Sequence, residues 1–116
     1  MLNVSAAKIF LCLEPTDMRK SFDTLAAVVR EELKGDPQSG TWFVFRGKRG
    51  SRLKILYWDR DGFAIWQKRL EKGVFELPKV IGDAAGVAIT ATDLSLILSG
   101  VALNARRRER YQAPEK

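Results

Sequence analysis

The chain has 116 residues, of which 46% are hydrophobic, so it is long enough for one compact core and too short for two comfortable domains. It contains no histidine and a single cysteine, which excludes histidine-based acid–base catalysis and zinc sites built from cysteine and histidine. The formal net charge of +6 makes a polyanion the natural partner.

The first predicted element is a strand over residues 8–13, a short apolar run closed by Glu14 and Pro15. A continuous apolar run of this length is typical of a strand that is buried on both faces. Cys12 lies within it, so we expect its thiol to be a small buried hydrophobe rather than a nucleophile, which would need a partner base.

A helix is predicted next, because apolar residues from Phe22 to Leu33 recur at helical spacing. Ser21 is the expected N-cap. Lys34 gives a basic last turn, and Gly35 is the expected C′ glycine that ends the helix.

From residue 41 the pattern becomes extended, which predicts a meander of antiparallel strands. Strands are expected over residues 41–45, 51–58 and 63–70, joined by a glycine-rich turn at 46–50 and by the turn Asp59-Arg-Asp-Gly62. A fourth meander strand is expected at residues 74–77, ended by Pro78.

The C-terminal part is predicted to hold an edge strand at residues 87–89 and a second, shorter helix. Thr90 and Asp93 have the spacing of a capping box, and Gly100 ends the helix. Residues 1–103 are therefore expected to form a single domain, followed at 104–116 by a basic, flexible tail with five basic and two acidic side chains.

This order of elements predicts an α+β fold: one domain with an antiparallel meander sheet of four to six strands and two helices packed on one face. The other face of the sheet would then be free. Alternation along residues 52–58 places Arg52, Lys54 and Trp58 on one face of their strand, opposite the core-facing Leu53 and Ile55.

The positive charge is concentrated in residues 46–72, which hold nine basic and three acidic side chains. These cations fall on adjacent predicted strands and their turns, so we expect this basic hairpin surface to contact the phosphates of DNA with little base readout. The candidate DNA-binding residues are Arg19, Lys20, Arg46, Lys48, Arg49, Arg52, Lys54, Lys68 and Arg69.

Two alternatives to DNA binding remain open. Trp58 and Trp66 are either base-stacking, core or partner-binding residues, and with Arg69 they suit an interface with another protein, where tryptophan and arginine dominate. Asp59 and Asp61 are compatible with Mg²⁺ ligation in a nuclease, but Asp-x-Asp-Gly is also ordinary turn chemistry. We expect no catalytic residue, no metal and no cofactor.

The loop over residues 17–20 allows two interpretations. In the first, Arg19 and Lys20 join the basic sheet face, or the N-terminus of the following helix meets a phosphate. In the second, the loop is braced by a local salt bridge.

Several linked motifs resemble one known family, the TnpB accessory proteins encoded by the second open reading frame of the IS-sixty-six insertion sequences. The resemblance covers roughly residues 7–103. Its motifs are Glu14-Pro-Thr-Asp-Met-Arg-Lys-Ser-Phe-Asp23, Phe43-Val-Phe-Arg-Gly-Lys-Arg-Gly50, Leu53-Lys-Ile-Leu-Tyr-Trp-Asp59, Asp61-Gly62 and Lys68-Arg-Leu-Glu-Lys-Gly73.

The resemblance implies participation in transposition beside a separately encoded transposase, as an accessory factor that is not an enzyme. DNA and the transposase of the same element are the expected partners. The chain shows no apolar stretch approaching the ~20 residues that span a bilayer and no secretory signal, so a cytoplasmic location is expected.

Overall fold

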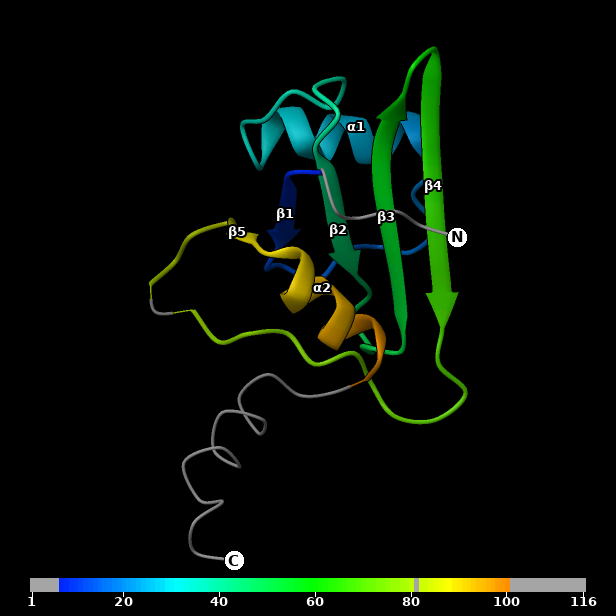
Figure 1. The fold of residues 1–116 in the computed structure, drawn as a ribbon, viewed down its shortest axis with the longest axis vertical. Helices are drawn as coiled ribbons and strands as arrows, with labels where there is room; N and C mark the ends of the chain where they lie inside the picture. The colour runs from blue at the N-terminus through cyan, green and yellow to red at the C-terminus, as the bar shows by residue number, and fades with distance from the viewer. Residues whose placement is uncertain (1–6, 81, 101–116) are drawn as a thin grey trace, which may run out of the picture.

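The computed structural model describes residues 7–80 and 82–100, which form one five-stranded sheet and two helices (Figure 1). The expected α+β class and the strand number are confirmed, whereas the predicted basic tail lies outside the described residues. The elements in chain order are β1 (Ile9–Cys12), α1 (Phe22–Glu31), β2 (Trp42–Arg46), β3 (Arg52–Asp59), β4 (Gly62–Arg69), β5 (Gly86–Ile89) and α2 (Ala91–Leu98).

The strands lie side by side in the order β4-β3-β2-β1-β5, so β4 and β5 are the two edges. The predicted hairpins are confirmed: β2, β3 and β4 form an antiparallel meander, with Val44 opposite Ile55 and Asp59 opposite Gly62. The sheet is mixed, because β1 runs parallel to β2 after the crossover through α1, while β5 pairs antiparallel with β1.

The expectation that both helices pack on one face is wrong, because α1 and α2 cover opposite faces of the sheet (Figure 1). Successive side chains of a strand point to opposite faces. On β2, Phe43 packs in the core beside α1, whereas Trp42 and Val44 pack in the core beside α2. A strand with apolar side chains on both faces must be shielded from water on both, and one helix packs against each face of this sheet.

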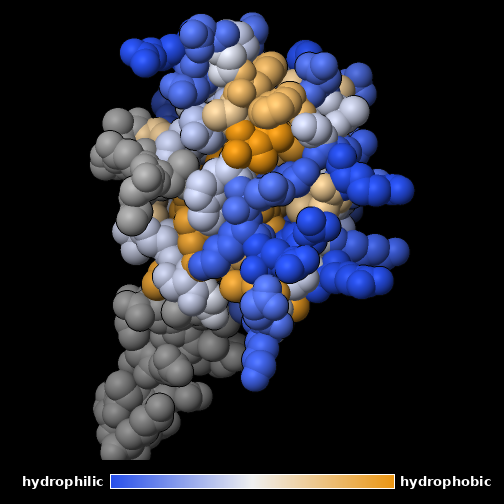
Figure 2. Space-filling view, turned by 90° about the vertical axis from the view of Figure 1, so that its right-hand side faces the viewer, coloured by the Kyte–Doolittle hydropathy of each residue, from blue (hydrophilic) through white to orange (hydrophobic). Residues whose placement is uncertain are grey.

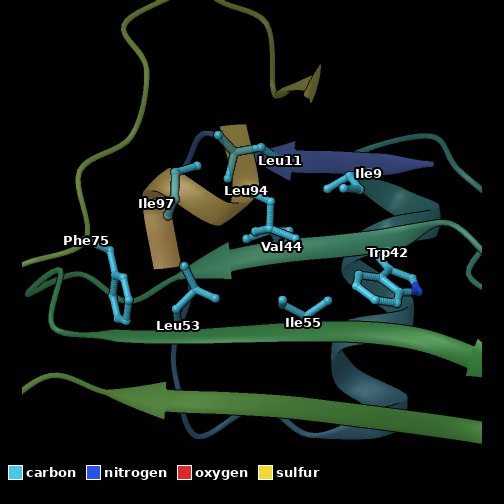
Figure 3. Packing of buried hydrophobic residues seen from close by; sticks show 9 residues of the cluster. All are labelled: Ile9, Leu11, Trp42, Val44, Leu53, Ile55, Phe75, Leu94 and Ile97. Atoms are coloured by element: carbon cyan, nitrogen blue, oxygen red, sulfur yellow. The ribbon is translucent and has the colours of Figure 1, made fainter. Parts of the chain in front are cut away.

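Two hydrophobic cores result, one on each face. The α2 side holds the larger cluster, whose side chains converge beneath that helix in Figure 3. The α1 side includes Cys12, which is 3% exposed, and burial raises the pKa of its thiol. The buried-thiol prediction for Cys12 is therefore confirmed. The α2-side core contains Ile9, Leu11, Trp42, Val44, Leu53, Ile55, Phe75, Leu94 and Ile97.

The predicted fourth meander strand at residues 74–77 is wrong, because this segment is irregular. Instead of pairing along a strand, its backbone makes two hydrogen bonds, both through Phe75. The Phe75 N–H donates to the Gly50 carbonyl at 2.7 Å, and the Phe75 carbonyl accepts from the Arg46 side chain, at Nη1, at 2.8 Å. The Phe75 side chain is completely buried in the α2-side core, so it anchors the segment without strand pairing.

The helix boundaries follow the predicted signals at three of four ends. Ser21 is the N-cap of α1, and the Thr90–Asp93 capping box is confirmed, with Thr90 Oγ1 accepting from the Asp93 N–H at 3.0 Å. Helix α1 ends earlier than expected, at Glu31, and Lys34 rather than Gly35 adopts the left-handed conformation. A Cβ on Gly35 would lie 3.3 Å from the Phe43 ring, so this residue packs closely against the ring without being left-handed.

Candidate nucleic-acid interface

An open groove of about 630 Å³ lies at the end of the sheet where β2 leads into the hairpin loop. Three segments line it: the loop before α1, the loop joining β2 to β3, and the adjoining ends of β3 and β4. The lining residues are Pro15, Thr16, Asp17, Met18, Gly47, Lys48, Arg49, Gly50, Ser51, Arg52 and Arg69.

The loop before α1 is held against the end of β2 by backbone pairing and by close packing. The Thr16 N–H donates to the Arg46 carbonyl at 3.0 Å, and Thr16 forms a parallel bridge with Gly47. A Cβ on Gly47 would lie 2.6 Å from Met18 Cγ, so the loop approaches this closely only because residue 47 is glycine. These contacts fix one wall of the groove.

Four cations, which we call the groove cations, project around this hollow: Lys48, Arg49, Arg52 and Arg69. All four are exposed. Arg52 and Arg69 are direct cross-strand partners on β3 and β4, so their side chains share one face of the sheet. Like charges placed directly opposite each other destabilise a strand pair, and an anion bound between them relieves that repulsion.

A smaller groove of about 280 Å³ shares Met18, Arg52 and Arg69 with the first and extends the basic surface along β3 and β4. Figure 2 shows the molecule from the β4 side, and hydrophilic side chains gather over the lower part of this view. Two further predicted residues, Lys54 and Lys68, line the smaller groove, together with Gln67 and Glu71.

Both of these lysines donate a hydrogen bond to a backbone carbonyl. Lys54 Nζ donates to the Lys20 carbonyl at 2.6 Å, which ties β3 to the start of α1. Lys68 Nζ donates to the Leu98 carbonyl at 3.3 Å, at the C-terminal end of α2. A cation at the C-terminus of a helix also interacts favourably with the helix dipole. Lys54 and Lys68 therefore brace the fold. Lys54 also adds positive charge beside Arg52, whereas Lys68 lies opposite Leu53 in the sheet register, so its side chain points to the α2 side and away from the face that holds Arg52 and Arg69.

Arg46 is not one of the groove-lining residues, contrary to the prediction that placed it on the same surface as Arg52. It lies opposite Leu53 in the sheet register and so points to the α2 side. Its Nη1 donates to the Phe75 carbonyl at 2.8 Å, and its Nε is buried without a partner. The structure gives Arg46 a bracing contact.

Arg19 and Lys20 do not line either groove. Arg19 Nη2 lies 2.7 Å from Asp17 Oδ2, so the predicted local salt bridge is present. Hydrogen bonds from Arg19 hold the pKa of the Asp17 carboxyl well below its ordinary value of 3.8. Lys20 contributes its carbonyl to Lys54. Asp17 is the single carboxylate in the lining of the larger groove, and Arg19 already balances its charge.

The three tryptophans occupy different environments. Trp42 is 8% exposed in the α2-side core. Trp58 is half-buried on the α1 side, where its ring meets that of Phe63 edge-on with centroids 5.0 Å apart. Trp66 is half-buried against the α2-side core. Neither lines the grooves, so a base-stacking platform beside the groove cations is not formed by these side chains.

Asp59 and Asp61 flank the turn between β3 and β4, on the far end of the hairpin from the grooves. Arg60 takes the left-handed backbone conformation of this turn, with φ of 60°. No group of three or more carboxylate or thiol side chains converges within residues 7–80 and 82–100.

Sequence reasoning missed the groove wall formed by Pro15, Thr16 and Met18. Its position depends on the bridge between Thr16 and Gly47, which lie 31 residues apart in the chain. The local signal available was the glycine at position 47, which was assigned to a turn and not to a close approach.

The family model of IS66 Orf2-like proteins matches residues 7–108. Two relatives from Sinorhizobium fredii are also similar. The uncharacterised protein y4hO is 42% identical over 94 residues, which cover 81% of this chain and 80% of the relative. The uncharacterised protein y4jC is 34% identical over 109 residues, which cover 94% of this chain and 92% of the relative.

No solved structure matches the chain. Among the described residues, neither helix is long and apolar enough to cross a membrane.

Proposed function

The chain belongs to the family of IS66 Orf2-like proteins of insertion sequences, and on that premise we propose that it is a non-catalytic accessory protein of transposition that binds the DNA backbone in the larger groove. The groove cations are the proposed contacts. The separate transposase of the element performs the chemistry.

The observation that carries this proposal is the direct opposition of Arg52 and Arg69 at the groove. Their repulsion is balanced within the described residues by one long contact, 3.6 Å between Arg69 Nη2 and Glu71 Oε2, and both side chains of that contact are largely exposed. Guanidinium groups bind phosphate oxygens through two parallel hydrogen bonds, so a phosphate suits the space between two arginines.

The hairpin loop supplies the other half of the proposed contact. Lys48 and Arg49 are exposed at its tip, across the groove from the loop before α1. Phosphate contacts of this kind position a protein on DNA without selecting a base sequence. We therefore propose binding with weak sequence preference and strong dependence on salt.

A salt titration of affinity for duplex DNA tests the proposal. If each groove cation neutralises one phosphate, log K falls with log salt with a slope of about −3.6, since each contact contributes ~0.9. Arg52→Ala should reduce the slope by ~0.9. The matched control is Arg30→Ala, which removes an exposed arginine from α1 outside both grooves and should leave the slope unchanged.

Two results would contradict the proposal. One is the absence of binding at low salt by protein whose circular dichroism shows it folded. The other is an equal loss of slope in the Arg52 and Arg30 variants, which would show that net charge alone, and not the groove, attracts DNA.

We propose as a second function that the protein docks on the transposase through Trp58 and Trp66, the two tryptophans that are only half-buried. They lie on opposite faces of the sheet, so each marks a separate contact. Tryptophan is enriched among the side chains that dominate protein interfaces. Co-purification of the two proteins that survives nuclease treatment supports this contact, and co-purification that is lost with the DNA contradicts it.

A further inference from the structure

Strand β4 is a long, open edge of the sheet. It pairs with β3 on one side over eight residues, and among the described residues no strand pairs with its other side. The opposite edge of the sheet, β5, has only four residues. An edge strand presents a row of free backbone donors and acceptors that another strand can pair with.

The first part of β4 lacks the features that normally block such pairing. Proteins protect an edge with charged side chains, proline or a bulge. From Gly62 to Trp66 the strand has no charge and no proline, and its register with β3 runs through eight consecutive pairs without a bulge. Seen from the β4 side, an apolar patch lies above the hydrophilic surface of the grooves (Figure 2).

We propose that a second copy of this chain pairs with β4, so that two β4 strands run antiparallel at the centre of a ten-stranded sheet. The charge distribution along the strand favours this occupant. The residue directly before β4 is Asp61, and the strand ends in Lys68 and Arg69. Antiparallel pairing of two copies sets the acidic start of each strand against the basic end of the other, so the edge is complementary to itself.

Symmetry restricts the register of this pair. A two-fold axis perpendicular to the sheet puts the α1 faces of both copies on the same side of the joined sheet. Side chains of directly opposite residues point to the same face, so the two residues must both be odd-numbered or both even-numbered. The pair is then centred on a residue. Centring on Ile65 places Asp61 opposite Arg69 of the second copy, which is an attractive contact.

The neighbouring registers are less favourable. Asp59 belongs to β3 and lies opposite Gly62 within the hairpin, so it is not part of the β4 edge. Centring on Trp66 then places Asp61 opposite Glu71, and centring on Ala64 places Arg60 opposite Lys68; both contacts join like charges. The inferred register therefore has Ile65 opposite Ile65, Phe63 opposite Gln67 and Asp61 opposite Arg69.

This assembly brings the two larger grooves to the same face of one continuous sheet. The two Arg69 residues lie eight residues apart in the inferred register, or about 27 Å along the strands. The inference of self-pairing does not rest on DNA binding, and its test uses protein alone, so either proposal can fail without the other.

The mass of the full chain in solution tests the pairing. Light scattering behind size-exclusion chromatography should give twice the chain mass of 13.1 kDa at high protein concentration and a fall toward 13.1 kDa on dilution. A mass of one chain at every concentration overturns the inference, whatever the protein binds.

A charge swap tests the register. Asp61→Arg and Arg69→Asp each place like charges together twice per dimer, and each should weaken the dimer about tenfold. The double variant Asp61→Arg/Arg69→Asp restores both attractive contacts and should recover the affinity of the parent. Asp23→Arg, an exposed change on α1, is the control for altered net charge and should leave the affinity unchanged.

Cysteine cross-linking provides a second measure of the register. Oxidised Ile65→Cys should form a covalent dimer because the two Cα atoms face each other at ~5 Å, whereas Gln67→Cys should stay monomeric under denaturing conditions because its two copies lie about 14 Å apart along the strands. A double variant as weak as the singles, or preferential cross-linking at position 67, overturns the inferred register.

Discussion

Arg46 and Arg52 flank the same hairpin loop and carry the same charge, yet they lie on opposite faces of the sheet. Arg46 faces the α2-side core and holds the Phe75 carbonyl, whereas Arg52 is exposed beside Arg69 in the groove. A count of cations along the sequence treats the two alike. Their different roles follow from strand alternation combined with the path of residues 74–77, and only the first of these is visible in the sequence.

The two arginines should therefore differ in their effect on stability. Arg46→Ala leaves the Phe75 carbonyl without its partner and should lower the free energy of unfolding by about 1–3 kcal/mol. Arg52→Ala removes an exposed charge that faces another arginine, so its effect should stay within about 0.5 kcal/mol. Urea denaturation followed by tryptophan fluorescence measures both. Equal destabilisation by the two substitutions would contradict the bracing role of Arg46.

The helices and hairpins were predictable because their signals are local. Ser21, Thr90 and Asp93 cap helices within one turn, and the hairpin strands are joined by short turns. The segment over residues 74–77 was mispredicted because its extended appearance depends on burying Phe75 and not on pairing. The pairing of β1 with β2 and β5 joins distant parts of the chain, and no local pattern specifies it.

The pairing of β5 with β1 depends on a glycine whose importance the sequence did not reveal. A Cβ on Gly86 would collide with the Phe10 ring and would lie 2.8 Å from the Leu11 carbonyl oxygen, which belongs to the paired backbone. Gly86→Ala should therefore displace β5 and lower the free energy of unfolding by about 1–3 kcal/mol.

Gly62→Ala is the matched control, because a Cβ at that position meets no atom within 4 Å and the backbone there is not left-handed. Its free energy of unfolding should stay close to that of the parent. Amide hydrogen exchange distinguishes a local effect: Gly86→Ala should accelerate exchange in β5 more than in β3. Uniform acceleration across the sheet would contradict a local loss of pairing.

At the scale of the whole molecule, the sheet separates two hydrophobic cores, and one helix covers each of them. The sequence predicted that each helix has an apolar face, but periodicity does not say which face of the sheet that helix covers. The groove cations were predictable as a basic segment, whereas the groove itself needs the loop before α1, which reaches it only in the folded chain.

Because both cores pack against the same sheet, we expect the protein to unfold in one cooperative transition. We also expect substitutions in the two cores to have additive effects on the free energy of unfolding. Leu25 lies fully buried on the α1 side and Ile97 fully buried on the α2 side, so they belong to different clusters. Leu25→Ala should cost about 2–5 kcal/mol and Ile97→Val about 0.5–1.5 kcal/mol. Because the two side chains share no packing partner across the sheet, the double variant should lose the sum of the two within about 0.5 kcal/mol.

Urea denaturation of the parent, the two single variants and the double variant completes this cycle, with tryptophan fluorescence and far-ultraviolet circular dichroism as the two probes. Coincident transitions show that both cores unfold together, as expected when the strands between them supply side chains to each. An interaction energy above about 1 kcal/mol would mean that strain passes through the sheet from one core to the other. Separate transitions for the two probes would instead mean that one helix detaches while the sheet remains folded.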